Sequence, residues 1–139
     1  KDEEAFCFTY GDGVSNVDIT SLIEFHNSHG KEATLTAVRP HSQYGALNIT
    51  NNMVTNFQEK PEGVGSWING GYFVLSPKVV DRIKDNASSW EDEPLVGLAK
   101  EGELASYEHS GFWQPMDTLR DKNFLERLWT SDKAPWKIW

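Results

Sequence analysis

Apolar residues recur along the chain first in a continuous run, then at helical spacing, then in a run again. Residues 5–10 form an apolar, β-favouring run that ends at the tight turn 11–13, which predicts a buried parallel strand. Asp18 is placed to cap, and Gly30 to end, a helix whose apolar residues recur three and four positions apart. Residues 33–38 predict a second buried strand. The order strand, helix, strand is that of a βαβ unit.

The rest of the chain predicts a hairpin and then alternating helices and strands. Residues 46–50 and 53–58 read as two strands that flank Asn51-Asn52, a typical two-residue hairpin turn. The later elements are expected as a strand over 72–75, a helix over 78–84, a helix over 90–99, a strand over 104–109, an irregular segment over 111–118 and a helix over 119–129. The apolar side chains expected to face inward from the last helix are those of Leu119, Phe124, Leu125 and Leu128.

These elements predict one α/β domain over residues 1–139, folded as a partial Rossmann-like αβα sandwich with a mixed, mainly parallel sheet. A chain of 139 residues is long enough for a single core. Its composition, 38% hydrophobic and 12% aromatic, lies well above that of a disordered segment, so the chain is expected to fold.

Charge and cysteine content narrow the function classes. The net charge is −8, from 13 Lys and Arg against 21 Asp and Glu, so a basic surface for nucleic acid is not expected. No apolar stretch reaches the roughly 18 residues that span a bilayer, so no membrane partner is expected. The single cysteine, Cys7, lies in the first apolar run, which predicts a buried, unreactive thiol and a reducing, cytoplasmic environment.

Two aspartates are the first candidates for chemistry. Asp12 follows a predicted strand, and ligands of open α/β sheets bind beyond the carboxyl ends of the strands. The alternative is an ordinary Gly-Asp-Gly turn. Asp117 precedes the last helix and is either a ligand or the helix cap, a role that Thr118 could also take. Two carboxylates from separate elements suit Mg²⁺, which takes one or two carboxylates together with phosphate oxygens and water.

A third candidate lies at the end of the predicted hairpin. Glu59 and Lys60 place a carboxylate and an ammonium side by side before Pro61, which restricts the preceding residue to extended backbone. The alternative is a pair of solvated charges at a turn. The four histidines show no convincing metal-ligand spacing and are interpreted as surface or core residues.

Taken together, five segments resemble the sugar-nucleotide pyrophosphorylases in residues, order and spacing. They are residues 11–13 (GDG), 44–47 (YGAL), 57–61 (FQEKP), 68–73 (INGGYF) and 112–118 (FWQPMDT). Within that superfamily, residues 113–122 (WQPMDTLRDK) and 133–137 (KAPWK) are similar to glucose-1-phosphate cytidylyltransferases. The resemblance covers essentially the whole chain and implies that it corresponds to the carboxyl-terminal part of the catalytic domain.

The resemblance implies transfer of a cytidylyl group from CTP to glucose 1-phosphate, which gives CDP-glucose and pyrophosphate. It implies Mg²⁺ as cofactor, with Asp12 and Asp117 as its ligands, and a homo-oligomer as the assembly. The residues that match sugar-phosphate contacts in the family are Tyr44, Gly45, Glu59, Lys60 and Asn69. Of these, Lys60 matches the lysine on the sugar phosphate, and together with the two aspartates it completes the expected catalytic set.

The chain also departs from the family pattern. It contains neither the Gly-Gly-x-Gly-Thr-Arg-Leu loop that holds the nucleotide phosphates nor the segment that recognises the base. The chain is therefore expected to be a truncated form that is inactive alone, with apolar surface exposed on its first strand. Two alternatives stay open: a non-catalytic module that binds sugar phosphate or a protein partner, and a uridylyl- or thymidylyltransferase relative.

Overall fold

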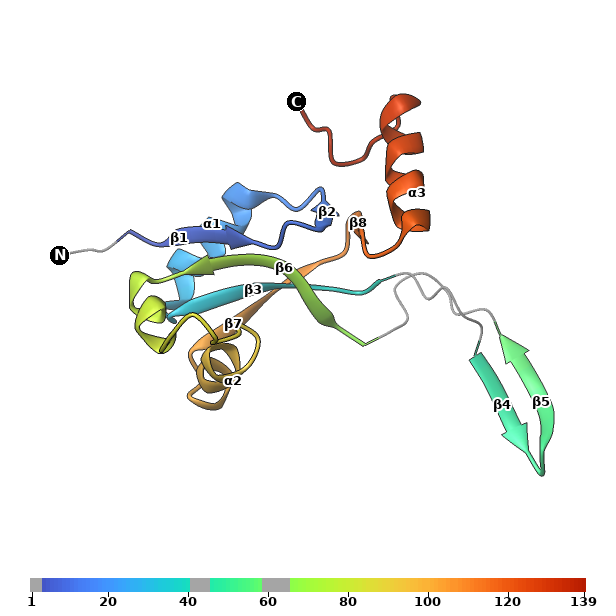
Figure 1. Cartoon of the computed structure of the whole chain (residues 1–139), viewed down its shortest axis with the longest axis horizontal. Helices are drawn as coiled ribbons and strands as arrows, with labels where there is room; N and C mark the ends of the chain where they lie inside the picture. Colours follow the sequence, from blue (N-terminus) through green and yellow to red (C-terminus); the bar gives the residue numbers. More distant parts are fainter. Residues whose placement is uncertain (1–3, 41–45, 59–65) are drawn as a thin grey trace.

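The computed structural model describes residues 4–40, 46–58 and 66–139. Strands and helices follow one another along these ranges, and most of the predicted elements are present (Figure 1). The elements are β1 (Phe6–Thr9), β2 (Gly13–Ser15), α1 (Ile19–His29), β3 (Ala33–Val38), β4 (Ala46–Thr50), β5 (Met53–Gln58), β6 (Ile68–Leu75), the 3₁₀ helix η1 (Pro77–Arg82), α2 (Glu93–Lys100), β7 (Leu104–His109), β8 (Trp113–Pro115) and α3 (Leu119–Thr130).

The main sheet has four strands in the order β1-β6-β3-β7. β6 pairs antiparallel with both β1 and β3, whereas β3 and β7 are parallel. Three of the four strands therefore run in one direction, and β6 opposes them. This confirms the predicted α/β fold with a mixed sheet. It also places β6 between the two strands of the expected βαβ unit, so β1 and β3 share a direction without touching as neighbours.

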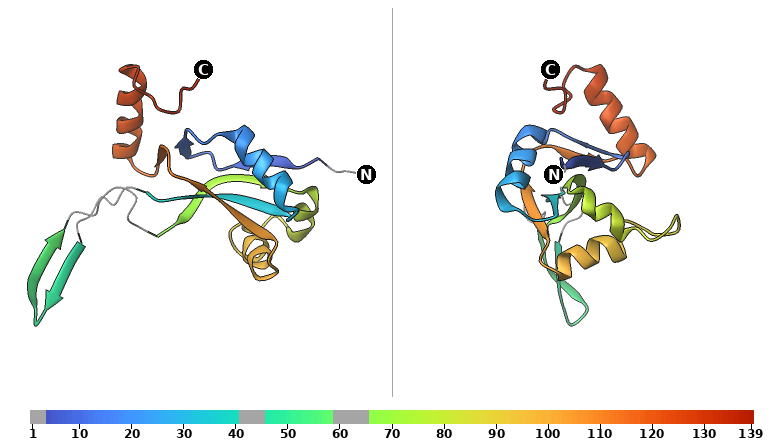
Figure 2. Two further views of the ribbon diagram at one scale, coloured as in Figure 1. Left: turned by 180° about the vertical axis from the view of Figure 1, so that it is seen from behind. Right: turned by 90° about the vertical axis from the view of Figure 1, so that its left-hand side faces the viewer.

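Helices cover both faces of this sheet (Figure 2). On one face, α1 packs against β3, β6 and β7. On the other face lie η1 and α2, where the buried core consists of Ala33, Phe73, Leu75, Val79 and Leu98. The alternation of side chains along a strand supplies both faces, because Ala33 points to this core while Thr34, the next residue along β3, points to α1.

The ends of α1 are those expected from the sequence. The Asp18 carboxylate accepts hydrogen bonds from the backbone N–H of Ser21 at 3.0 Å and from its hydroxyl at 2.9 Å, which also lowers the pKa of Asp18. Gly30 ends the helix with φ of 67°, a left-handed conformation that favours glycine.

The first strand differs from the prediction in direction and burial. The prediction of a buried parallel strand over residues 5–10 was wrong, because β1 is an exposed edge strand whose one neighbour in the described sheet, β6, is antiparallel. Phe6 and Phe8 are each 37% exposed, which confirms the expectation of exposed apolar surface on this strand. The expectation of a buried Cys7 was also wrong, since its thiol is exposed. A pocket of about 210 Å³ beside it is lined by Cys7, Phe8, Thr9, Ile19, Leu22, Tyr72 and Phe73.

The predicted hairpin is confirmed. β4 and β5 pair antiparallel and extend away from the main sheet (Figure 1). Asn51 and Asn52 both have positive φ, 49° and 61°, as a two-residue turn between right-twisted strands requires.

The carboxyl-terminal helix begins with a reciprocal cap. Thr118 Oγ1 accepts a hydrogen bond from the backbone N–H of Asp121, and the Asp121 carboxylate accepts one from the backbone N–H of Thr118. Leu125 is buried, but the expectation that Leu119 faces inward was wrong, because its side chain is 71% exposed at the first turn. None of the helices in the described ranges is long and apolar enough to cross a membrane.

After α3 the chain turns back along the helix, and its aromatic residues pack there. Trp136 stacks on Trp129 with ring centroids 6.5 Å apart and lies against Phe112 at 5.5 Å. Trp136 is thus half-buried. The last residue, Trp139, is 81% exposed.

A directed chain of hydrogen bonds links α1 to β3. The Lys31 backbone N–H donates to His29 Nδ1 at 2.9 Å, so neutral His29 carries its proton on Nε2 and donates it to Thr34 Oγ1 at 2.7 Å. The Thr34 hydroxyl then donates to Nδ1 of buried His26 at 2.8 Å. Burial lowers the pKa of both histidines. Repulsion from a second positive charge lowers each pKa further: that of His26 through protonated His29, and that of His29 through Lys31.

We expect the free energy of unfolding to fall as the pH drops below about 6.5, the ordinary pKa of histidine. Because the folded-state pKa of both histidines is lowered, the unfolded chain binds protons first as the pH falls, and stability is complete only above the unfolded value. Urea titrations at pH 7.5 and 5.5 measure this, and His26→Gln should reduce the difference. Equal stability at the two pH values would contradict the assignment.

Candidate functional site

The candidate residues gather at one edge of the main sheet. β1, β3 and β7 run in the same direction and end at this edge, where β6 begins. Asp12 follows β1, Asn69 lies at the start of β6, and the segment that carries Asp117 follows β7. Ligands of open α/β sheets bind at the edge where parallel strands end.

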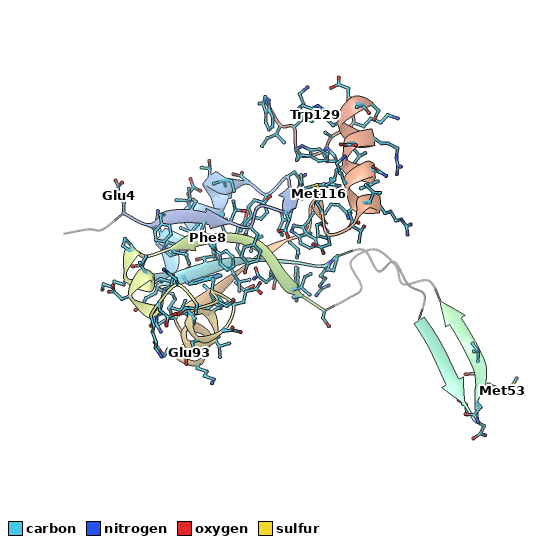
Figure 3. All side chains as sticks on the ribbon, in the orientation of Figure 1. Glu4, Phe8, Met53, Glu93, Met116 and Trp129 are labelled. Carbon is cyan, nitrogen blue, oxygen red and sulfur yellow. The ribbon has the colours of Figure 1, made fainter. Side chains whose placement is uncertain are left out.

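A small two-stranded ribbon brings the two aspartates to the same place. β2 and β8 pair antiparallel, with Gly13 opposite Pro115 and Ser15 opposite Trp113. The pairing continues one step further, because the Met116 backbone N–H donates to the Asp12 carbonyl at 2.7 Å. Asp12 is therefore bonded to the residue immediately before Asp117. Figure 3 shows Met116 between this ribbon and the base of α3.

The cap of α3 excludes one of the two roles considered for Asp117, that of helix cap. Thr118, and not Asp117, caps the helix. Asp121 completes the cap, accepts hydrogen bonds from Thr118 and from Gln114 Nε2 at 3.1 Å, and its pKa is lowered chiefly by the Thr118 hydroxyl. These polar contacts hold the backbone around Asp117 without using its carboxylate.

Both aspartate side chains are exposed, and within the described part of the chain neither carboxylate accepts a hydrogen bond or forms an ion pair. Among those same residues no three histidine, cysteine, aspartate or glutamate side chains form a metal-binding group. Carboxylates that are free of protein partners are the kind of protein ligand that Mg²⁺ takes, together with phosphate oxygens and water.

Two adjacent glycines of β6 have no side chains and so allow close packing at this edge of the main sheet. A Cβ at Gly70 would lie 2.9 Å from a methyl of Val38, and a Cβ at Gly71, where φ is 79°, would lie 2.8 Å from the ring of Tyr10. The bare backbone lets the Gly70 carbonyl accept a hydrogen bond from Trp113 Nε1 at 2.8 Å. From the other side, the Tyr72 hydroxyl donates to the Gly13 carbonyl at 2.9 Å.

The oxygen and the nitrogen of the Asn69 side-chain amide each form a hydrogen bond with a neighbouring residue. Its Oδ1 accepts a hydrogen bond from the Gly71 backbone N–H at 2.9 Å, and its Nδ2 donates to the Tyr10 hydroxyl at 3.1 Å. The Tyr10 hydroxyl in turn donates to Glu91 Oε1 at 2.8 Å. Burial first, and then the bond to Glu91, raise the pKa of Tyr10 to about 12, so the phenol stays protonated at neutral pH.

Known proteins are similar to this chain in sequence and in fold. The sequence profile of a family described as nucleotidyl transferase matches residues 1–114. The chain belongs to the nucleotidyl transferase family. It is 60% identical over 139 residues to the glucose-1-phosphate cytidylyltransferase of Salmonella typhimurium, covering 100% of this chain and 54% of that protein. It is 44% identical over 138 residues to the probable glucose-1-phosphate cytidylyltransferase of Bacillus subtilis, covering 99% and 54%. The family resemblance inferred from the motifs is thus confirmed, and the chain spans about half the length of these relatives.

Solved structures support the nucleotidyl transferase fold. The crystal structure of HddC from Yersinia pseudotuberculosis matches with a TM-score of 0.61 at 21% identity, over 88% of this chain and 54% of that one. A second structure of the same protein, complexed with GMP-PN, matches with a TM-score of 0.59. At this identity the likeness concerns the fold alone.

Four of the residues expected in the nucleotidyl transferase site, Tyr44, Gly45, Glu59 and Lys60, lie outside the described residues. The chain leaves the site edge after β3 and returns to it before β6. Its two flanks are held together there, because the Arg39 guanidinium lies 4.2 Å from the ring centroid of Trp67.

Sequence reasoning missed Tyr10, Trp113 as a bridge to Gly70, and Glu91. Tyr10 and Glu91 are 81 residues apart, and Glu91 was expected inside a helix that in fact begins at Glu93. The one available signal was Tyr10 itself, a hydroxyl-bearing aromatic residue at the end of the strand that carries Asp12.

We expect Gly71→Ala to destabilise the protein more than Gly102→Ala does. Both glycines have positive φ, but nothing lies within 4 Å of a Cβ built on Gly102, whereas Gly71 would meet Tyr10. Gly102→Ala should therefore show only the cost of the left-handed backbone, about 1–2 kcal/mol, and Gly71→Ala an additional overpacking cost of about 1–3 kcal/mol. Chemical denaturation gives both free energies. Equal losses would mean that Tyr10 yields to the added methyl.

Proposed function

We propose that this chain supplies the sugar-phosphate and metal-binding end of a nucleotidyltransferase that joins CTP and glucose 1-phosphate into CDP-glucose with release of pyrophosphate. One observation carries the proposal: through the β2–β8 ribbon, the backbones of Asp12 and Asp117 lie close together at the edge of the sheet where the parallel strands end, and both side chains are exposed. The 60% identity to a glucose-1-phosphate cytidylyltransferase supports this choice of substrates.

The reaction suits a site of this composition. The phosphate oxygen of glucose 1-phosphate is already an anion, so it attacks the α-phosphate of CTP without a strong base. The main obstacles are the approach of two negatively charged groups and their alignment. Both are overcome by positioning and charge neutralisation. Mg²⁺ bound by Asp12 and Asp117 would supply part of that neutralisation.

The remaining roles follow from the family resemblance. Lys60 places a positive charge on the sugar phosphate. Glu59, Asn69 and the Gly45 backbone make hydrogen bonds to sugar hydroxyls, and Tyr44 belongs to the same substrate-binding set. Asn69 is the described member of this group, and it retains one N–H donor and one carbonyl lone pair beyond its contacts to Tyr10 and Gly71.

Calorimetric titration with glucose 1-phosphate, with and without Mg²⁺, tests the proposal. We expect Mg²⁺ to strengthen binding to the unmodified chain and expect Asp12→Asn and Asp117→Asn each to remove most of that gain, about tenfold in affinity or ~1.4 kcal/mol. Asp81→Asn, which alters an exposed aspartate in η1, is the matched control and should bind as the unmodified chain does. Absence of binding at millimolar glucose 1-phosphate would overturn the proposal.

A second candidate is a sugar-phosphate-binding module without catalysis. It is favoured by one observation, the match of Glu59, Lys60 and Asn69 to sugar-phosphate contacts in the family, which require no nucleotide. Pyrophosphate release from CTP, glucose 1-phosphate and Mg²⁺ tests the module. Turnover by the chain alone that is lost in Asp12→Asn would overturn the module and also the expectation that the chain is inactive alone. The same assay with UTP or dTTP tests the sister transferases.

A further inference from the structure

Each hydrogen bond at the Tyr10 hydroxyl has a definite donor and a definite acceptor. A carboxylate only accepts hydrogen bonds, so the Tyr10 O–H donates to Glu91 at 2.8 Å. The phenolic oxygen is then left as an acceptor, and Asn69 Nδ2 donates to it at 3.1 Å. The chain of bonds therefore runs from Asn69 through Tyr10 to Glu91.

This direction fixes the orientation of the Asn69 amide. Since Nδ2 faces Tyr10 and Oδ1 accepts from the Gly71 N–H at 2.9 Å, a flip of the amide would set a carbonyl oxygen against the phenol oxygen and N–H against N–H. One N–H and one lone pair of the amide stay available, and each points in a set direction.

The relay, as we call the hydrogen bonds from Asn69 through Tyr10 to Glu91, ends at an exposed turn residue but is connected to the core at Tyr10 and beside Glu91. The Tyr10 ring lies 5.6 Å from Phe73, which is buried, and its backbone N–H donates to the Gly71 carbonyl. Glu91 follows Trp90, whose ring packs edge-on against Phe73 at 5.6 Å. The Tyr10 ring and Trp90, the residue before Glu91, thus pack against the same buried ring.

We propose that Tyr10 and Glu91 are positioning residues that hold Asn69 in the orientation required to bind a hydroxyl of the sugar phosphate. The inference rests on the proposed function, because it assigns Asn69 to the substrate, and it deepens that function by adding two residues that do not contact the sugar. Glu91 acts through Tyr10, and Tyr10 acts through Asn69.

Four variants of the chain test the relay, together with an Asn69→Ala background. Tyr10→Phe keeps the ring and removes only the hydroxyl. Glu91→Ala removes the acceptor, whereas Glu91→Gln keeps an oxygen that accepts from the phenol. Asp92→Asn is a matched control, since Asp92 is the adjacent exposed carboxylate and has no side-chain capping bond.

Calorimetry with glucose 1-phosphate and Mg²⁺ gives the first readout. Tyr10→Phe and Glu91→Ala should each weaken binding about three- to tenfold, the effect of one lost hydrogen bond. Glu91→Gln and Asp92→Asn should bind within about twofold of the unmodified chain. In the Asn69→Ala background, Tyr10→Phe should have no further effect, because its partner is gone. Equal losses in both backgrounds would show a merely structural role and overturn the relay.

The second readout needs no ligand. The side-chain amide signals of Asn69 in a ¹⁵N–¹H spectrum should move and broaden in Tyr10→Phe and stay unchanged in Asp92→Asn. If the unmodified chain fails to bind glucose 1-phosphate, the proposed function is wrong whatever the spectra show. If binding occurs but the Asn69 signals and the affinity are both unchanged in Tyr10→Phe, the relay alone is wrong.

Discussion

The close approach of backbone at Gly70 and Gly71 is the constraint on which the site depends. β6 lies between β1 and β3 and opposes both, so its first residues reach the edge where the other strands end. Without side chains at these two positions, the strand passes within contact of Val38 and Tyr10 and offers its carbonyl to Trp113. The main sheet, the β2–β8 ribbon and the Asn69 amide are thus held against one short stretch of chain. A side chain at either glycine would displace all three together, because close-packed groups transmit such strain.

Local features of this fold could be predicted from the sequence, because each depends on a few neighbouring residues. The Asp18 cap, the Gly30 stop and the Asn51-Asn52 turn all follow from backbone preferences and were found as expected. Burial of the first strand could not be predicted, since an apolar run gives no information on which elements cover it. Nor could the pairing of β2 with β8, because three residues are too few to show a periodicity.

Some features of the candidate site could also be predicted from the sequence, and others depend on the fold. Asp12 and Asp117 could be chosen from the resemblance, but only the long-range ribbon shows that their backbones meet, across about a hundred residues of sequence. The choice between ligand and cap at Asp117 was open in the sequence, and the Thr118–Asp121 pair rules out the cap. Glu91 carries no local signal at all, because its partner lies just after the first strand. Contacts of this kind depend on topology, and topology is what a single sequence specifies least directly.

The exposed β1 strand has a consequence for how the protein behaves in solution. One side of its backbone has no strand partner in the described sheet, and Phe6 and Phe8 lie along it. Such an edge accepts any further extended segment, whether from another molecule of the chain or from an unrelated peptide. Strand addition gains backbone hydrogen bonds and apolar contact at once, and it favours growth of assemblies at high concentration. Any segment that covers this edge would therefore limit such assembly.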